Sequence, residues 1–333
     1  MKDFAEAGIG SRQKSLTKEE IESSAGRIGR IIANIEKVIL GKHSMVELTV
    51  LALICGGHVL IEDVPGVGKT SLVSALAKTV SCDFNRIQFT PDVMPSDITG
   101  FSVYNQKTGE FEFRAGAVIS NIVLADEINR ASTKTQSSLL EAMEEKQVTV
   151  DTQTYTLPEP FMVLATQNPI DSFGTYPLPE AQIDRFLMKL SIGYPSLDEE
   201  INIALHVKEA RAALESVTTG EEVLELRVLA DRVYISPDLA RYIVSIVAAT
   251  RDHPDLVLGC SPRGSIAMFQ ICRAYALARG RGFVIPDDVK YLAPYVLSHR
   301  LSLSREARIR KIGGKDIIDS ILSRAAVPKG EGR

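Results

Sequence analysis

The segment HVLIEDVPGVGKTSLVSALA, residues 58–77, carries residue types that bind phosphate groups. An apolar run ends in a Gly/Pro loop, and the loop leads into Lys69, Thr70 and an apolar-striped stretch typical of a helix. Gly66 and Gly68 let backbone N–H groups approach phosphate oxygens, and the helix amino terminus adds its positive dipole end. Lys69 can reach the outer phosphates of a nucleoside triphosphate, and Thr70 can ligate Mg²⁺. We expect a nucleotide to contact Asp63, Val64, Pro65, Gly66, Val67, Gly68, Lys69, Thr70 and Ser71.

A second segment, NIVLADEINRA, supplies two acids where an apolar run ends. Ligands of open α/β sheets bind at the carboxyl edge of the strands, so we expect these acids to face the phosphates. Asp126 is predicted to hold the Mg²⁺ and Glu127 to polarise the attacking water. Many strands end in acids, and the signal gains its strength from following a phosphate-binding loop.

Three further polar residues complete the pattern. Asn168 follows the apolar run FMVLAT and is predicted to orient the hydrolytic water, although Asn-Pro is also a turn signal. Arg185 stands before another apolar run; it could form a surface ion pair, or in a ring it could reach the γ-phosphate bound by the neighbouring subunit. Arg263 starts a helix, and folding of the helical region over the nucleotide would bring it to the phosphates.

Five short apolar runs must position these residues. They alternate with helical patterns, as in a buried parallel sheet with crossover helices. The runs are HVLIED, FNRIQF, NIVLAD, FMVLAT and FLMKLSI. Two other segments, FSVYNQKTGEFEFR and QVTVDTQTYTLP, alternate apolar and polar residues around a turn and predict hairpins.

The chain divides into an α/β region and a helical region. Residues 1–16 are polar and predicted to be a loose leader, and Thr17 opens a capping box. We assign residues 17–195 to an α/β nucleotide-binding domain with a parallel sheet and flanking helices. Residues 196–333 are predicted to form a small, all-α lid domain. Within it, Ser236-Pro237 and Ser261-Pro262 each place an N-cap serine before a proline in the first helical turn.

Composition places the chain among ordinary globular proteins. Its 38 basic and 42 acidic side chains give a formal net charge of −4, which provides no argument for a nucleic-acid partner. The start of the sequence lacks the apolar core of a signal peptide, and the apolar stretch near residues 48–60 is too broken to span a bilayer. Cys55, Cys82, Cys260 and Cys272 lack metal-ligand spacing and are expected to be reduced thiols in the cytoplasm.

The strings ADEINRASTKTQSSLLEAMEEKQVTV, GTYPLPEAQIDRFLMKL and TRDHPDLVLGCSPRGSIA resemble those of MoxR-family AAA+ ATPases. The resemblance covers roughly residues 35 to 328 and implies a P-loop NTPase fold of the AAA+ type, in the clade related to magnesium chelatase ATPase subunits. Asp63 replaces the first glycine of the usual GxxxxGK[ST] motif, but the DVPGVGKT form also occurs in this family.

The resemblance also implies a role for each matching residue. Gly41 sits where such proteins line the adenine pocket with backbone. Both predicted hairpins would face the ring pore or the substrate, and Arg114 and Arg130 beside them are candidates for inter-subunit or signalling residues. The implied roles are Walker A for Lys69 and Thr70, Walker B for Asp126 and Glu127, sensor 1 for Asn168, arginine finger for Arg185 and sensor 2 for Arg263.

The leading hypothesis is an ATP-driven, Mg²⁺-dependent and chaperone-like remodeller that works as a homo-oligomer, with a hexamer expected. MoxR relatives typically act with a protein carrying a von Willebrand factor A domain, and the DxSxS string of that domain is absent here, so the partner would be a separate polypeptide. The alternative is the ATPase motor of a metal chelatase. A nucleotide-gated scaffold is disfavoured by Glu127 and Asn168, and a replication helicase by the lack of a DNA-binding appendage.

Overall fold

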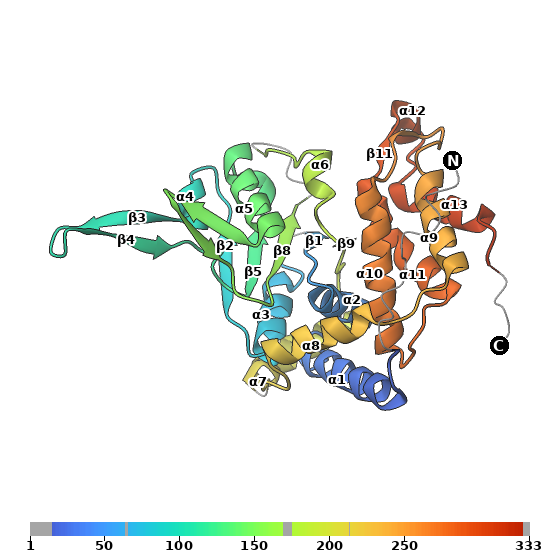
Figure 1. Cartoon of the computed structure of the whole chain (residues 1–333), viewed down its shortest axis with the longest axis horizontal. Helices are drawn as coiled ribbons and strands as arrows, with labels where there is room; N and C mark the ends of the chain where they lie inside the picture. Colours follow the sequence, from blue (N-terminus) through green and yellow to red (C-terminus); the bar gives the residue numbers. More distant parts are fainter. Residues whose placement is uncertain (1–14, 64–65, 169–174, 213, 329–333) are drawn as a thin grey trace, which may run out of the picture.

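As predicted, the five apolar runs form one parallel sheet, and the structure gives its strand order as β2-β5-β8-β1-β9. Figure 1 shows the computed structural model, which describes residues 15–63, 66–168, 175–212 and 214–328. The strands of this sheet are β1 (Val59–Glu62), β2 (Phe84–Gln88), β5 (Ile122–Asp126), β8 (Met162–Gln167) and β9 (Met188–Leu190). Because β1 lies between β8 and β9, the loop after β1 sits at the middle of the carboxyl edge.

Alternate residues of the strands belong to two different hydrophobic cores, as the two-residue period of a strand requires. In β5, Ile122 and Leu124 face one core, and Val123 and Ala125 face the other. β2 departs from the predicted burial: it is an edge strand, and Ile87 is its one buried residue. Its polar side chains, Asn85, Arg86 and Gln88, are exposed.

Helices cover both faces of the sheet. The core on one face contains residues of α5, and the core on the other contains residues of α1, α2, α3 and the helical region. Thr17 caps α1 through the predicted capping box. The helices up to residue 183 are α1 (Lys18–Glu36), α2 (His43–Ile54), α3 (Lys69–Thr79), α4 (Pro95–Thr99), the 3-10 turn η1 (Ile128–Arg130), α5 (Thr133–Glu145) and α6 (Glu180–Ile183).

Both predicted hairpins are present. The first, β3 (Gly100–Asn105) with β4 (Glu110–Ala115), projects away from the sheet (Figure 1). The second is β6 (Gln147–Val150) with β7 (Gln153–Thr156). Phe113 of the first hairpin stacks on Tyr155 of the second, with ring centroids 3.8 Å apart. The two hairpins are thus joined at their bases.

Beyond Pro195 the described residues are mainly helical, as predicted; they also contain the short antiparallel pair of β10 (Leu256–Leu258) with β11 (Ser302–Leu303) and an isolated bridge between Tyr234 and Phe283. Ser236 and Ser261 cap α9 and α10 through their side chains. Every helix of the described residues is too short or too polar to cross a membrane. The helices after Pro195 are α7 (Leu197–Ala212), α8 (Gly220–Asp231), α9 (Pro237–Ala249), α10 (Pro262–Ala278), α11 (Pro286–Leu297), the 3-10 turn η2 (Ser298–Arg300), α12 (Arg305–Ile309) and α13 (Gly314–Arg324).

Candidate nucleotide site and arginine pocket

The loop after β1 wraps around a cavity of about 350 Å³. Gly66 and Gly68 have φ of +88° and +93°, and a Cβ built on either would meet no atom within 4 Å. Their backbone is therefore open toward the cavity, in a conformation that side-chain-bearing residues rarely adopt. The cavity is lined by Gly66, Gly68, Lys69, Thr70, Ser71, Arg86, Gln88, Asp126 and Glu127, so the structure brings most of the predicted phosphate-site residues together. Val64 and Pro65 lie outside the described residues.

Lys69 starts α3 and is largely buried. Its ammonium donates to the Asp63 carbonyl oxygen at 3.0 Å, which holds the side chain across the loop. Thr70 and Asp126 line the same cavity, and together they provide a hydroxyl and a carboxylate. Such hard oxygen donors suit Mg²⁺.

Thr166 of β8 links the two acids of the neighbouring strand. Its hydroxyl donates to Asp126 Oδ1 at 2.7 Å and accepts from the Glu127 backbone N–H at 2.8 Å. Asp126 also forms an ion pair with Arg86 of β2, with 2.6 Å between Oδ2 and Nη2. The position of the Asp126 carboxylate is therefore fixed from both neighbouring strands.

Glu127 turns the chain directly after β5. Its φ of +57° is left-handed, which costs a residue with a side chain about 1 kcal/mol or more. The carboxylate lies 3.0 Å from Arg130 Nε, and Gln88 donates to it at 3.2 Å. Arg130, a candidate signalling residue in the sequence, thus contacts the predicted catalytic acid of its own chain.

A second cavity of about 400 Å³ adjoins the first, because Gly66, Gly68 and Ser71 line both. Its other walls are mainly apolar and include Val38, Leu40, Met45, Val67, Ile192, Tyr194 and Pro195. An apolar cavity joined to a phosphate cradle suits a purine base and its ribose. Gly41 lies between Leu40 and Lys42 of this wall; its φ of +71° is one that side-chain-bearing residues rarely adopt, and a Cβ there would require the Glu199 side chain to move.

The Asp63 side chain lines neither of these two cavities. Its carboxylate accepts from the backbone N–H groups of Ile192 and Gly193 and from the Ser191 hydroxyl. Asp63 therefore contributes its carbonyl oxygen to the phosphate loop and its carboxylate to the segment that leaves β9. Asn168 directly follows β8 at the same edge of the sheet, but it does not line the phosphate cavity.

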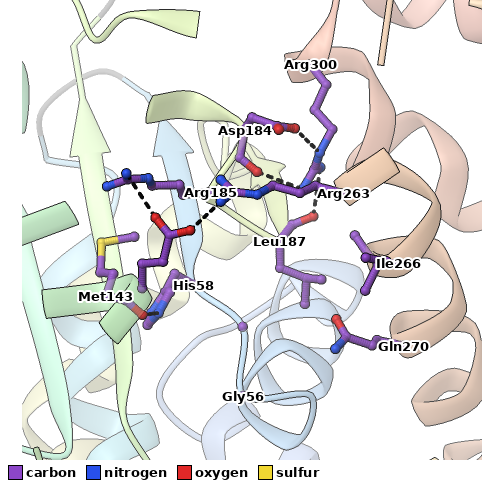
Figure 2. Close-up of a pocket in the computed structure, with 13 residues that line it drawn as sticks. Gly56, His58, Met143, Asp184, Arg185, Leu187, Arg263, Ile266, Gln270 and Arg300 are labelled. Atoms are coloured by element: carbon purple, nitrogen blue, oxygen red, sulfur yellow. Dashed lines mark hydrogen bonds and ion pairs between the residues drawn. The ribbon is translucent and has the colours of Figure 1, made fainter. Parts of the chain in front are cut away.

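Arg185 and Arg263 meet in a different cavity, of about 240 Å³. Figure 2 shows both side chains in this pocket, which we call the arginine pocket. Arg185 comes from the segment before β9 and Arg263 from the first turn of α10. Both form ion pairs with the Glu144 carboxylate at the end of α5.

The arginine pocket and the phosphate cavity lie at opposite edges of the sheet. His58 and Leu187 of the pocket directly precede β1 and β9, whereas the phosphate loop follows β1. The four residues of β1 alone separate the two edges by roughly 13 Å. The structure therefore does not bring Arg263 to the phosphates of its own chain, contrary to the expectation from the sequence. The helical region packs beside the amino edge of the sheet instead of closing over the loop.

A buried ion pair holds the helical region in that place. Arg300, whose side chain is 3% exposed, donates from Nε to Asp184 Oδ1 at 2.9 Å and from Nη2 to the Phe186 carbonyl at 2.7 Å. The Ser261 hydroxyl donates to the second oxygen of Asp184 at 2.8 Å. Burial lowers the pKa of Arg300, and the Asp184 carboxylate opposes that change.

His58 forms the floor of the arginine pocket and is buried. Its Nδ1 accepts from the Val163 backbone N–H at 3.0 Å, so its Nε2 must carry the proton that faces the Met143 carbonyl at 3.1 Å. Burial lowers the pKa of His58 to about 4. The imidazole is therefore a neutral structural bridge between β8 and α5.

Arg86, Gln88, Thr166 and Glu144 were not predicted from the sequence. The first two end a strand beside the Asp126 strand, and Thr166 lies in the ATQNP string, so the carboxyl-edge rule that selected Asp126 could have found them. Glu144 stands in an exposed acidic run of a helix and gave no comparable signal.

Known proteins show the same combination of domains. A family model described as the ATPase family associated with various cellular activities (AAA) matches residues 58–188, and an AAA lid domain model matches residues 248–321. YeaC of Bacillus subtilis is 52% identical over 90% of this chain and 95% of its own. The chaperone MoxR1 of Mycobacterium tuberculosis is 40% identical over 93% of this chain and 85% of its own. A solved structure from Cytophaga hutchinsonii superposes with a TM-score of 0.88 at 40% identity, covering 94% of this chain and 98% of that one.

The parallel sheet, the glycine-rich phosphate loop and the helical lid define an AAA-type P-loop fold. Within that class, the chain belongs to the MoxR family of AAA+ ATPases.

Proposed function

We propose that the protein hydrolyses ATP to ADP and phosphate in a ring of identical subunits, with a hexamer expected, and uses the energy to remodel a partner protein complex. The observation that supports a ring is the separation of the phosphate cavity from the arginine pocket. The phosphate cavity of one chain lacks Arg185 and Arg263, which stand together at the opposite edge of the sheet. A second copy can supply them.

In this proposal the base occupies the apolar cavity and the triphosphate lies along the loop from Gly66 to Ser71. Thr70 and Asp126 would hold Mg²⁺, which would neutralise charge on the β- and γ-phosphates. Glu127 polarises the attacking water, and Asn168 helps to orient it at the end of the adjacent strand. Arg185 and Arg263 of the neighbouring subunit stabilise the charge on the phosphoryl group during transfer.

The chaperone-like role is supported by the family and by an exposed surface. MoxR1 bears the name of a chaperone. The projecting hairpin exposes Tyr104 by 53% and Phe111 by 73%, and their rings lie 5.3 Å apart. Large exposed aromatic side chains on a protruding element suit contact with another protein. We propose that the partner is a separate polypeptide, with a von Willebrand factor A domain as the expected type, and that the protein works in the cytoplasm.

The test measures whether one subunit completes the site of another. Turnover per subunit should rise with protein concentration as rings assemble, and doping with Arg185→Ala subunits should lower the turnover of wild-type subunits. Loss of an arginine finger costs about 10³-fold or more in rate, so a neighbour lacking the residue should nearly silence the site it faces. Arg241→Ala, which removes an arginine from an exposed surface pair, is the control. Turnover that is independent of both concentration and doping would rule out the shared site.

A further inference from the structure

The Glu144 carboxylate holds two arginines from different parts of the chain. Its Oε2 lies 2.9 Å from Nη2 of Arg185, and its Oε1 pairs with Nη2 of Arg263. The two arginines lie in the arginine pocket (Figure 2) and come from the segment before β9 and from the first turn of α10. One carboxylate therefore sets the distance and the orientation of both cations with respect to each other.

An isolated ion pair on a protein surface usually contributes little to stability. Glu144, in contrast, belongs to two ion pairs within one cluster of charges. The Arg185, Glu144 and Arg263 side chains are 30%, 36% and 47% exposed, so the cluster is set apart by its charge and not by its burial: a third cation, Arg300, lines the same pocket. Asp184, the other acid of the pocket, is engaged by Arg300 and Ser261. Glu144 is thus the carboxylate that offsets the repulsion between Arg185 and Arg263.

The backbone around the arginines is fixed, whereas their side chains need a partner. Asp184 and Ser261, close to Arg185 and Arg263 in sequence, are joined by a hydrogen bond, which locks the two segments together. An arginine side chain still carries about 2 kcal/mol of rotamer entropy, which is lost when it must adopt one geometry. A carboxylate that holds the guanidinium beforehand removes much of that cost at the reacting site.

The helix that carries Glu144 also begins beside the catalytic acid of the same chain. Arg130 of η1 contacts Glu127, and α5 starts three residues later, capped by Ser132. The 13 residues of α5 span about 20 Å between that end and Glu144. A rigid helix therefore connects the nucleotide site of one subunit with the arginines that it presents to the next.

We infer that Glu144 is the positioning residue of the shared active site: it sets Arg185 and Arg263 for the phosphates of the neighbouring subunit. This inference rests on the function proposed above. Glu144 itself does not touch the nucleotide, so its removal should slow turnover without weakening nucleotide binding. It should do so in the neighbouring subunit rather than in its own.

The first experiment compares Glu144→Gln with Glu145→Gln, an exposed neighbour on the same helix. We expect Glu144→Gln to lower kcat by about 10- to 100-fold, the range for a misplaced catalytic group. The Kd for a fluorescent ATP analogue should stay within about twofold, because the pocket lies at the other edge of the sheet. Glu144→Asp, which keeps the charge, should recover part of the loss. The inference would be overturned if weaker binding of the analogue explained all of the loss of turnover in Glu144→Gln. It would also be overturned if Glu144→Gln turned over ATP at the wild-type rate.

The second experiment identifies the subunit that Glu144 serves. Wild-type rings are doped with Lys69→Ala subunits, which cannot use ATP but present intact arginines, or with Lys69→Ala/Glu144→Gln subunits. We expect the double variant to lower the turnover of wild-type subunits further than the single variant does, at equal incorporation measured by co-sedimentation. Glu144→Ala at matched incorporation replaces Glu144→Gln if the latter enters rings poorly.

Lys69→Ala/Arg185→Ala subunits separate the two proposals. If they inhibit and the Glu144 double variant does not, the positioning role is wrong and the shared site stands. If neither inhibits beyond Lys69→Ala, the shared site itself is wrong, and the role of Glu144 is overturned with it.

Discussion

Acidification should destabilise the fold through His58, a neutral imidazole at the base of the arginine pocket. Both ring nitrogens have partners, and Nδ1 must accept a hydrogen bond from Val163. Protonation would place a proton on Nδ1, which would then face the Val163 N–H with no acceptor between them. The folded-state pKa, about 4, lies below the usual 6.5, so the folded state favours the neutral form. The contribution is therefore fully present above pH 6.5 and is lost as the pH falls toward 4.

The size of this effect follows from the difference between the two pKa values. Well below pH 4 it amounts to about 3 kcal/mol of unfolding free energy, and about 2 kcal/mol of this is already lost at pH 5. Urea unfolding is measured at pH 7.5 and at pH 5 for the wild type and for His58→Gln, whose side chain does not titrate in this range. The decrease in the free energy of unfolding between the two pH values is called the acid loss of each protein. His299, also buried, has a pKa well below 6.5 and should keep its own share of the acid loss in both proteins.

The difference between the two acid losses isolates His58, even if His58→Gln is less stable at both pH values. We expect the variant to lose about 2 kcal/mol less than the wild type between pH 7.5 and pH 5. His43→Gln, which removes a largely exposed histidine, controls for the substitution of any histidine. Equal acid losses in the wild type and His58→Gln would refute the argument that the neutral form of His58 is required.

Two further substitutions test the site and the placement of the helical region. Glu127→Gln should slow hydrolysis by about 10²- to 10⁴-fold while still binding a fluorescent ATP analogue; failure to bind would show that the acid is misassigned. Asp184→Asn should lower the unfolding free energy by about 3–5 kcal/mol because it leaves the buried Arg300 without a counter-ion. Asp238→Asn, which breaks an exposed pair at 3.0 Å, should cost less than about 1 kcal/mol in the same urea titration, and equal losses would contradict the role given to Asp184.

The elements that the sequence predicted best are those that local patterns specify. The five apolar runs become the central strands, and polar–apolar alternation around a turn becomes each hairpin. β10 and β11 were missed because they contain three and two residues that pair across more than 40 positions of mostly helical sequence. Strands this short carry no measurable period.

The positions of the arginines could not be predicted from local patterns. The sequence indicated that Arg263 starts a helix, which is confirmed, but not on which edge of the sheet that helix would pack. That choice depends on contacts between distant residues, such as Arg300 with Asp184 and with the carbonyls of Phe186 and Leu187. Once these contacts place the helical region at the amino edge, Arg263 joins Arg185.

The acid at the first position of the phosphate loop has a physical reason in the structure. A glycine at position 63 would still offer its carbonyl oxygen to Lys69, but it would leave the backbone N–H groups of Ile192 and Gly193 without the carboxylate that now accepts from them. Buried donors without acceptors cost about 1–3 kcal/mol each. Ile192 and Gly193 also line the apolar cavity beside the loop. Asp63 thus ties the phosphate loop to the segment after β9 that forms a wall of the proposed base site. A nucleotide that fills both cavities would therefore contact two elements that the Asp63 carboxylate already connects.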